Sequence, residues 1–156
     1  MHVLSVLALA TVAHLSVPFV PQEKDTCGAA ALAMVLGYWG RPAAHAEVAA
    51  ALVEPELRGI RGVRLADFAR GRGVFAVAYE GDMAQLREYV GKGRPLIVAW
   101  KVGRDRFHDV VVVGFDDRAV VVHDPAEGAG RRVGARVFEE RWAGAGYWTL
   151  LVMPAP

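Results

Sequence analysis

The sequence predicts an α+β fold, with helices in the first half of the chain and an antiparallel sheet in the second. Helical apolar patterns that end at glycine recur between residues 27 and 93. Runs rich in valine and aromatic residues, separated by turn residues, dominate from residue 95 to residue 154. At 156 residues and 54% apolar composition, the chain is long and apolar enough to bury the core of one domain.

The first residues form an apolar run, "MHVLSVLALATVA", that is too short to span a bilayer but suits the core of a signal peptide. We expect a signal peptide over residues 1–15, a papain-like domain over residues 16–156, and an exported or periplasmic location, with a cytoplasmic location as the alternative. No Lys or Arg precedes the run, and the same residues also fit a buried strand or helix. No later segment reaches the roughly 20 apolar residues of a membrane helix, so we expect no integral membrane segment in the mature chain.

Residues 16–22 contain two prolines and are predicted to form an extended arm. Asp25 and Thr26 offer N-cap side chains for a helix that begins at Cys27 and is apolar on every face. We expect this helix to be central and buried. The small residues 28–31 on its first turns indicate a close approach by backbone or by a ligand.

Three further helices and one strand complete the first half of the predicted fold. In the helix over residues 63–73 we expect Val63, Leu65 and Phe68 to share a face. In the helix that starts at Asp82 the acidic first turn favours the helix dipole. The remaining elements are a helix over residues 44–54 and a strand over residues 74–80.

The second half is predicted to hold four strands and one short helix. Four consecutive valines, Val110 to Val113, indicate a strand that is buried on both faces. The predicted strands are residues 94–102, 107–117, 119–125 and 147–154, with a helix over residues 138–144.

Composition and charge exclude several classes of function. The net charge of +1 gives no field that would attract nucleic acid or an anionic membrane. A single cysteine excludes an internal disulfide and a structural zinc site made of cysteines. The glycine-basic turns lack the spacing of a phosphate-binding loop, and no cofactor is implied.

The only cysteine, Cys27, lies where a helix begins, and the unsatisfied N–H groups there stabilise a thiolate. A thiolate nucleophile needs a base, and the base needs an orienting acceptor. Two histidines, His108 and His123, lie at the ends of predicted strands and are the candidates. The other three are expected on the surface or in the leader, namely His2, His14 and His45.

The turn after residue 115 folds the two histidine-bearing strands into a hairpin, which brings His108 close to the end of the next strand. The apolar strands do not fix the register, so the partner of His108 is either Asp124 or His123. Gln22, on the arm before the nucleophile, has an amide that would donate to a developing oxyanion.

Three stretches, "VPFVPQEKDTCGAAALAMVLGYWG", "RFHDVVVVGFDD" and "VVHDPAEG", closely resemble the bacteriocin-processing, double-glycine-leader peptidases, a papain-like family of bacterial cysteine peptidases. The stretches "GIRGVRLADFARGRG" and "FEERWAGAGYWTLLVMP" are similar to a stand-alone, exported branch of it. The resemblance implies a papain-like fold and a peptide or protein substrate. It also implies Gln22 as oxyanion-hole residue, Cys27 as nucleophile, His108 as general base and Asp124 as its orienting acid, with His123 structural.

Other readings of these residues remain open. One is a catalytically silent papain-like module that binds peptides, and another is a thiol acyltransferase that passes the acyl group to an amine. A metal site is disfavoured, since neighbouring strand residues point to opposite faces. Its ligands would be His108, Asp109, His123 and Asp124. The resemblance names neither the substrate sequence nor a secretion or transporter partner.

Overall fold

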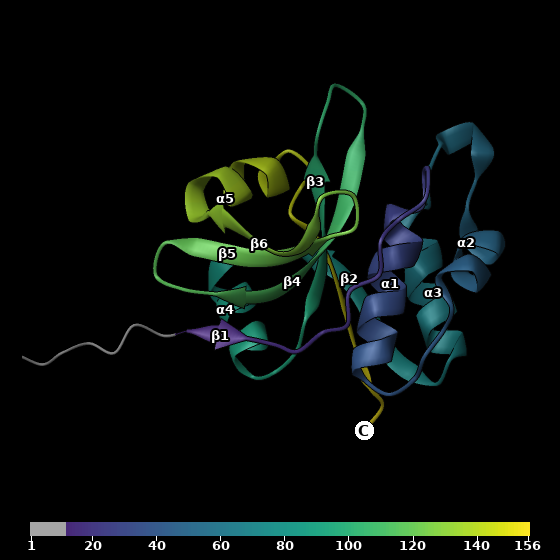
Figure 1. Ribbon diagram of the computed structural model, residues 1–156, viewed down its shortest axis with the longest axis horizontal. Coiled ribbons are helices and arrows are strands. Elements are labelled where there is room, and N and C mark those ends of the chain that lie inside the picture. The colour runs from purple at the N-terminus through teal and green to yellow at the C-terminus, as the bar shows by residue number, and fades with distance from the viewer. Residues whose placement is uncertain (1–11) are drawn as a thin grey trace, which may run out of the picture.

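The computed structural model describes residues 12–156 and shows one antiparallel sheet with helices on both faces (Figure 1). The strand order is β2-β7-β3-β4-β5-β6, and β1 pairs with the end of β4. The predicted α+β class is therefore confirmed. The strands are β1 (Ala13–His14), β2 (Val74–Glu80), β3 (Leu96–Lys101), β4 (Phe107–Phe115), β5 (Ala119–Asp124), β6 (Gly128–Gly134) and β7 (Trp148–Pro154).

Five α-helices and one short 3-10 helix are described. They are α1 (Cys27–Tyr38), α2 (His45–Leu52), α3 (Gly62–Gly71), α4 (Met83–Gly91) and α5 (Ala135–Ala143), with the 3-10 turn at Pro55–Leu57. Helices α1, α2 and α3 lie together on one side of the sheet, and α4 and α5 lie on the other (Figure 1). None of the helices in the described part of the chain is long and apolar enough to cross a membrane.

The sheet separates two hydrophobic cores, and β4 contributes to both. Val111 and Val113 pack with the helical layer of α1 to α3, whereas Val110 and Val112 pack with α4 and α5. All four valines are fully buried, as the unbroken apolar run predicted. Each core gains its stability mainly from the removal of this apolar surface from water.

Helix α1 is buried along almost its whole length, which confirms the expectation of a central helix. Thr26 is its N-cap residue, but the prediction that a side chain caps the helix was wrong. The Thr26 hydroxyl instead accepts from the backbone N–H of Glu23 and donates to its carbonyl, both at 2.9 Å. Helix α4 does have a side-chain cap, since Asp82 accepts from the N–H of Gln85 at 2.9 Å.

Strand β6 and the buried face of helix α3 differ from the sequence predictions. Strand β6 was not predicted, because its run of glycine and arginine has low strand propensity, yet it pairs with β5 over five residue pairs. Val63 was expected to share a face with Leu65 and Phe68 but is 60% exposed, while Leu65, Ala66 and Ala69 are buried. The buried face of α3 thus includes Ala66 and Ala69 and excludes Val63.

Most of the predicted signal peptide over residues 1–15 falls on residues 1–11, which lie outside the described residues. Ala13 and His14 form β1 and lie opposite Phe115 and Gly114 of β4. A β-carbon at Gly114 would come within 2.4 Å of the carbonyl oxygen of Ala13. Only glycine therefore allows β1 to approach β4 this closely.

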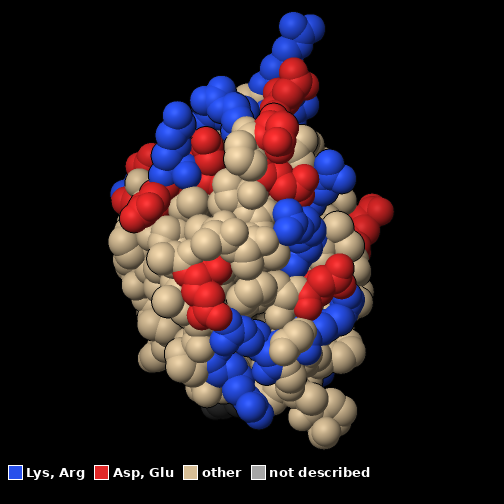
Figure 2. All heavy atoms as spheres, turned by 90° about the vertical axis from the view of Figure 1, so that its right-hand side faces the viewer, with Lys and Arg blue, Asp and Glu red and all other residues tan. Residues whose placement is uncertain are grey.

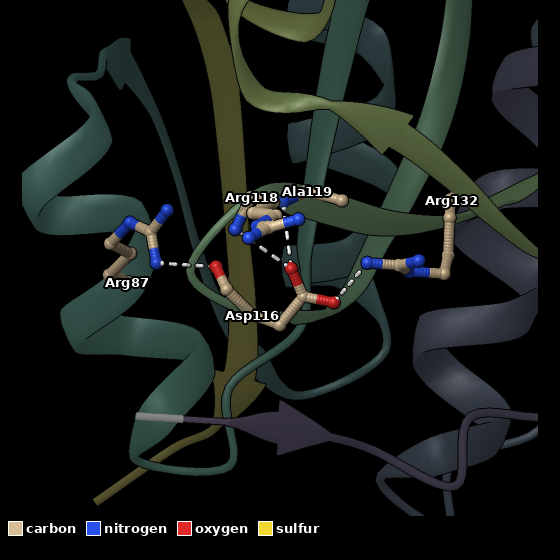
Figure 3. Close-up of polar contacts among 5 residues, drawn as sticks. All are labelled: Arg87, Asp116, Arg118, Ala119 and Arg132. Carbon is tan, nitrogen blue, oxygen red and sulfur yellow. Dashed lines mark hydrogen bonds and ion pairs between the residues drawn. The ribbon is translucent and has the colours of Figure 1, made fainter. Parts of the chain in front are cut away.

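Asp116, at the turn between β4 and β5, joins the turn to two neighbouring elements (Figure 3). Its carboxylate accepts from the backbone N–H groups of Arg118 and Ala119, each at 2.9 Å, and forms an ion pair with Arg132 of β6. Its carbonyl oxygen accepts from Arg87 of α4 at 3.0 Å. The turn thus ties β6 and α4 to the hairpin that carries Asp124.

Candidate active site

The four residues proposed from the sequence, Gln22, Cys27, His108 and Asp124, all line one open cleft of about 1720 Å³. They come from three parts of the fold: the extended arm and the start of α1, the first residues of β4, and the end of β5. Residues far apart in the chain thus meet in one place.

Cys27 is half-buried and is the first residue of α1. No side chain caps the helix, so the N–H groups of its first turn have no side-chain acceptor. These groups, at the positive end of the helix dipole, stabilise negative charge on the sulfur or on an oxygen held next to it. Gly28 follows, and a β-carbon there would lie 2.8 Å from a carboxylate oxygen of Asp109.

His108 meets Asp124 and not His123, which resolves the register that the sequence left open. Nε2 of His108 lies 2.6 Å from Oδ1 of Asp124. His123 lies opposite Val111 instead. The ladder between β4 and β5 shifts at a bulge between Val112 and Gly114, a feature that the uniform valine pattern does not reveal.

The pair of His108 and Asp124 favours the charged forms of both groups. Burial lowers the pKa of His108, but hydrogen bonds with Asp124 and Cys27, together with the negative charges of both, raise it to about 10. Burial raises the pKa of Asp124, but the hydrogen bond and positive charge of His108 and the N–H of Ala126 lower it overall. The imidazole is therefore held as an imidazolium next to the thiol at neutral pH.

Gln22 is held by its backbone, and its side chain keeps its hydrogen-bonding capacity. The Gln22 N–H donates to the carbonyl of Pro125 at 3.0 Å, which ties the arm to the residue after Asp124. Its side-chain oxygen is buried without a hydrogen-bond partner among the described residues. The side chain also lines the cleft, where the N–H groups of its amide nitrogen can donate to an oxygen that enters.

His123 fastens the arm to the sheet. Its Nε2 lies 2.8 Å from the carbonyl oxygen of Val17, and its Nδ1 accepts from the N–H of Gly130 at 3.0 Å. One neutral tautomer, with the proton on Nε2, satisfies both contacts. Phe19 packs edge-on against the imidazole at 5.8 Å. Both nitrogens are occupied, so His123 supports the site without facing the thiol.

The sequence analysis missed the role of His45, which it placed on the surface. His45 is half-buried, and its Nε2 lies 2.8 Å from the hydroxyl of Thr26, the residue before Cys27. Because the single hydroxyl proton already goes to the carbonyl of Glu23, His45 is the donor. No sequence pattern gave this contact, since it joins the starts of two helices.

The cleft is lined by more cationic than anionic side chains. Four of these cationic side chains form no ion pair with another described residue: Lys101 at the end of β3, Arg106 just before β4, Arg131 of β6 and Arg141 of α5. Seen from the helical side, the surface carries interspersed basic and acidic groups around an uncharged area (Figure 2). No three potential metal ligands cluster anywhere in residues 12–156.

A thiol at a helix start, an imidazolium held by a carboxylate, and free N–H donors beside them form an arrangement for acyl transfer. The thiolate can attack a carbonyl, and the imidazolium can protonate the leaving group. The helix N–H groups and the Gln22 amide can bind the oxygen that becomes negative.

Comparison with known proteins gives a family and a fold. The model of the Peptidase_C39 like family matches residues 14–149. A comparison with curated protein sequences found no match.

Several solved structures share the fold. One is a double glycine motif protease from an AMS/PCAT transporter in complex with the leader peptide, at 25% identity and a TM-score of 0.76 over 92% of this chain and 95% of that one. A putative C39-like peptidase from Bacillus anthracis has 19% identity and a TM-score of 0.78, covering 93% and 98%. The peptidase domain of Streptococcus ComA, a bifunctional ABC transporter involved in a quorum sensing pathway, has 23% identity and a TM-score of 0.71, covering 88% and 98%.

Proposed function

This chain belongs to the Peptidase_C39 like family and is a cysteine peptidase of the bacteriocin-processing type, and we propose that it hydrolyses peptide bonds through the thiol of Cys27. The observation that carries the proposal is the 2.6 Å contact between His108 and Asp124 beside that thiol. It supplies an oriented imidazole where a cysteine nucleophile requires one.

In the proposed reaction, the thiolate of Cys27 attacks the carbonyl carbon of the substrate and forms a tetrahedral intermediate. The imidazolium of His108 then donates its proton to the leaving amine, which leaves an acyl-enzyme and a neutral imidazole. A water molecule, deprotonated by His108, hydrolyses the thioester and restores the thiolate. Asp124 holds the imidazole in one orientation and stabilises its charged form throughout.

The oxyanion of the intermediate is proposed to lie between the Gln22 amide and the backbone N–H of Cys27. Two features support this. Gln22 and Cys27 line the same cleft, and α1 has no side-chain cap that would compete for its N–H groups. Donors that are fixed before the reaction stabilise the developing charge without reorganisation.

Two of the similar structures concern peptide processing: one contains a leader peptide, and one is the peptidase domain of an ABC transporter. By analogy, we propose a peptide or protein substrate that is cleaved within a leader segment. We also propose that the chain acts after export, on the basis of its apolar first residues.

The test is the rate of Cys27 alkylation by iodoacetamide across pH, in the wild type and in His108→Ala. A thiolate paired with an imidazolium reacts rapidly in mildly acidic buffer, where an ordinary thiol with a pKa of about 8.5 reacts slowly. We expect rapid reaction in the wild type and slow reaction in the variant, with circular dichroism as the check on folding. Equal, slow reaction in both would reject the proposed nucleophile.

Peptide cleavage then separates hydrolysis from the alternatives. Incubation with a proteome-derived peptide library, read by mass spectrometry, should give new free carboxyl termini that are absent with Cys27→Ala. A silent peptide-binding module would give no cleavage despite peptide binding. An acyltransferase would give amide products in place of carboxylates when an amine is added.

A further inference from the structure

We propose that a pocket next to Cys27 binds a positively charged group of the substrate, either a Lys or Arg side chain or a free α-amine. This inference rests on the proposed peptidase function and adds a specificity determinant to it. We call the site the Asp109 pocket, and it is bounded by Gly62, Leu65, Ala99, Asp109 and Trp148.

The sheet defines the floor and two walls of the Asp109 pocket. Ala99 of β3 lies opposite Asp109 of β4. On the other side of β3, Val98 pairs with Thr149 of β7. This register places Trp148 beside Ala99. Cross-strand neighbours share a face, so all three side chains lie on the side of α1 and α3. Adjacent strands are about 4.8 Å apart, which puts the two walls about 10 Å apart with a methyl group between them.

Helix α3 forms the back of the pocket, and Gly62 at its start lies against Trp148. A β-carbon at Gly62 would come within 2.3 Å of the Trp148 ring, and a β-carbon at Gly28 would come within 3.2 Å of Leu65. Glycines at these two points let the helices lie close to the sheet, and a β-carbon at Gly28 would also come within 2.8 Å of Oδ2 of Asp109. Asp109, Ala99, Gly62 and Trp148 all line the same cleft as Cys27.

The carboxylate of Asp109 has no cation of its own in the protein. Among the described residues it makes no ion pair and no hydrogen bond. Arg61, one residue before Gly62, pairs with Glu54 at 3.4 Å. Lys101, two residues along β3 from Ala99, is exposed and makes no ion pair with Asp109. A half-buried carboxylate without an ion pair or a hydrogen bond is stabilised by a cation that a ligand supplies.

Asp109 is charged when a substrate arrives. Burial raises the pKa of Asp109 to about 6, and the positive charge of His108 opposes that rise, so the carboxylate is ionised at neutral pH. Its negative charge lies in a cleft that is lined by more basic than acidic side chains. The ring of Trp148 on the opposite wall can pack against the aliphatic stem of a Lys or Arg side chain.

The same chemistry arises from two sources, a cationic side chain next to the cleaved bond or the α-amine of a short amino-terminal segment. A proteome-derived peptide library cut with a glutamate-specific protease contains internal Lys and Arg. It can be prepared in two forms, one with free amines and one in which the amines are acetylated. Enrichment of Arg at one fixed position in both forms indicates the side chain. Cleavage close to the peptide amino terminus, seen only with free amines, indicates the α-amine.

Asp109→Asn, which keeps the shape of the side chain, is the central variant. We expect its preference for the cationic group to fall by roughly tenfold, the lower end expected for one hydrogen bond to a charged group. Asp105→Asn removes the same charge from another part of the cleft and should leave the preference unchanged. Ala99→Val fills the floor and should lower cleavage of the cationic substrates without any change of charge.

A second measurement needs no substrate. Cationic and anionic methanethiosulfonate reagents modify Cys27, and we expect the ratio of their rates to fall several-fold in Asp109→Asn but not in Asp105→Asn. Two outcomes overturn the Asp109 pocket and leave the peptidase function intact. In the first, the wild type cleaves peptides without a preference for a cationic group. In the second, both the preference and the ratio of modification rates are unchanged in Asp109→Asn. Absence of any cleavage, with a changed rate ratio, rejects the peptidase and keeps the pocket.

Discussion

Nε2 of His108 lies 2.6 Å from Oδ1 of Asp124, whereas Asp109, the next residue in the chain, faces the opposite side of β4. One strand thus places an imidazole on the side of Asp124 and a carboxylate on its opposite face. This division follows from the alternation of side chains along a strand. Asp109 and Asp124 therefore have different surroundings, and substitution of each residue should have a different effect.

Asp124→Asn should lower peptidase activity by about 10²- to 10⁴-fold, the range for loss of effective acid–base catalysis. The hydrogen bond and charge of Asp124 raise the pKa of His108, while burial lowers it. Without Asp124 the imidazolium should lose its proton at a lower pH. The alkaline limb of the rate of Cys27 alkylation, and the NMR titration of His108, should therefore both move to lower pH. Asp117→Asn, in the exposed turn nearby, should move neither.

The same pair should stabilise the fold only within a window of pH. The raised pKa of His108 contributes stability that is complete below about pH 6.5 and is lost as the pH rises through about 10. The lowered pKa of Asp124 contributes stability that is present above its ordinary value and is lost on acidification. The difference in Tm between the wild type and His108→Ala should thus be largest above the ordinary pKa of an Asp carboxyl and below about pH 6.5. A difference that grows above pH 10 would contradict the pairing.

Gln22→Ala should raise the barrier of the chemical step by about 2.7 to 4 kcal/mol if its amide binds the oxyanion. Binding of substrate should change little, so the loss should appear in kcat. Alkylation of Cys27 by iodoacetamide forms no oxyanion and should keep its rate. A normal kcat in a folded Gln22→Ala variant would remove Gln22 from the reaction.

Gly114→Ala should destabilise the protein, because its methyl group would overlap the carbonyl oxygen of Ala13 at 2.4 Å. Displacement of β1 or strain in β4 should cost about 1–3 kcal/mol in the free energy of unfolding, measured with urea. Gly71→Ala is the matched control, since nothing lies within 4 Å of a β-carbon there. That change should be neutral or slightly stabilising.

Asp116→Ala should lower the Tm, because it leaves the N–H groups of Arg118 and Ala119 without their acceptor and releases Arg132. Hydrogen bonds and the charge of Arg132 hold the pKa of Asp116 below its ordinary value. The difference from the wild type should therefore shrink as the pH falls into the range where carboxylates are protonated. Asp117→Ala, in the same turn, should leave the Tm unchanged.

The sequence predicted the fold well where apolar periodicity decides the structure. Helix α1, the valine-rich strand β4 and the strand β7 were all predicted close to their observed bounds. It failed at β6, where glycine and arginine hide a strand that forms because β5 offers it an open edge. It also failed at Val63, since α3 is short and its pattern fits two neighbouring faces.

The candidate site was predictable in its residue types but not in its geometry. A cysteine at a helix start and histidines at strand ends indicated the chemistry. The choice between Asp124 and His123 depended on a bulge that the valines conceal, and the family resemblance made that choice. The contact between His45 and Thr26 and the unpaired carboxylate of Asp109 depend on packing between distant segments, which no local pattern encodes.

The hydrogen bond from Gln22 to Pro125 has a consequence for when activity appears during synthesis. Cys27 leaves the ribosome long before His108, Asp124 and the segment that positions Gln22. Contacts between such distant segments form late, because the intervening chain must first be ordered. On the proposed mechanism, a newly made chain therefore gains peptidase activity only after the segment up to Pro125 has been made and has bound the arm that carries Gln22.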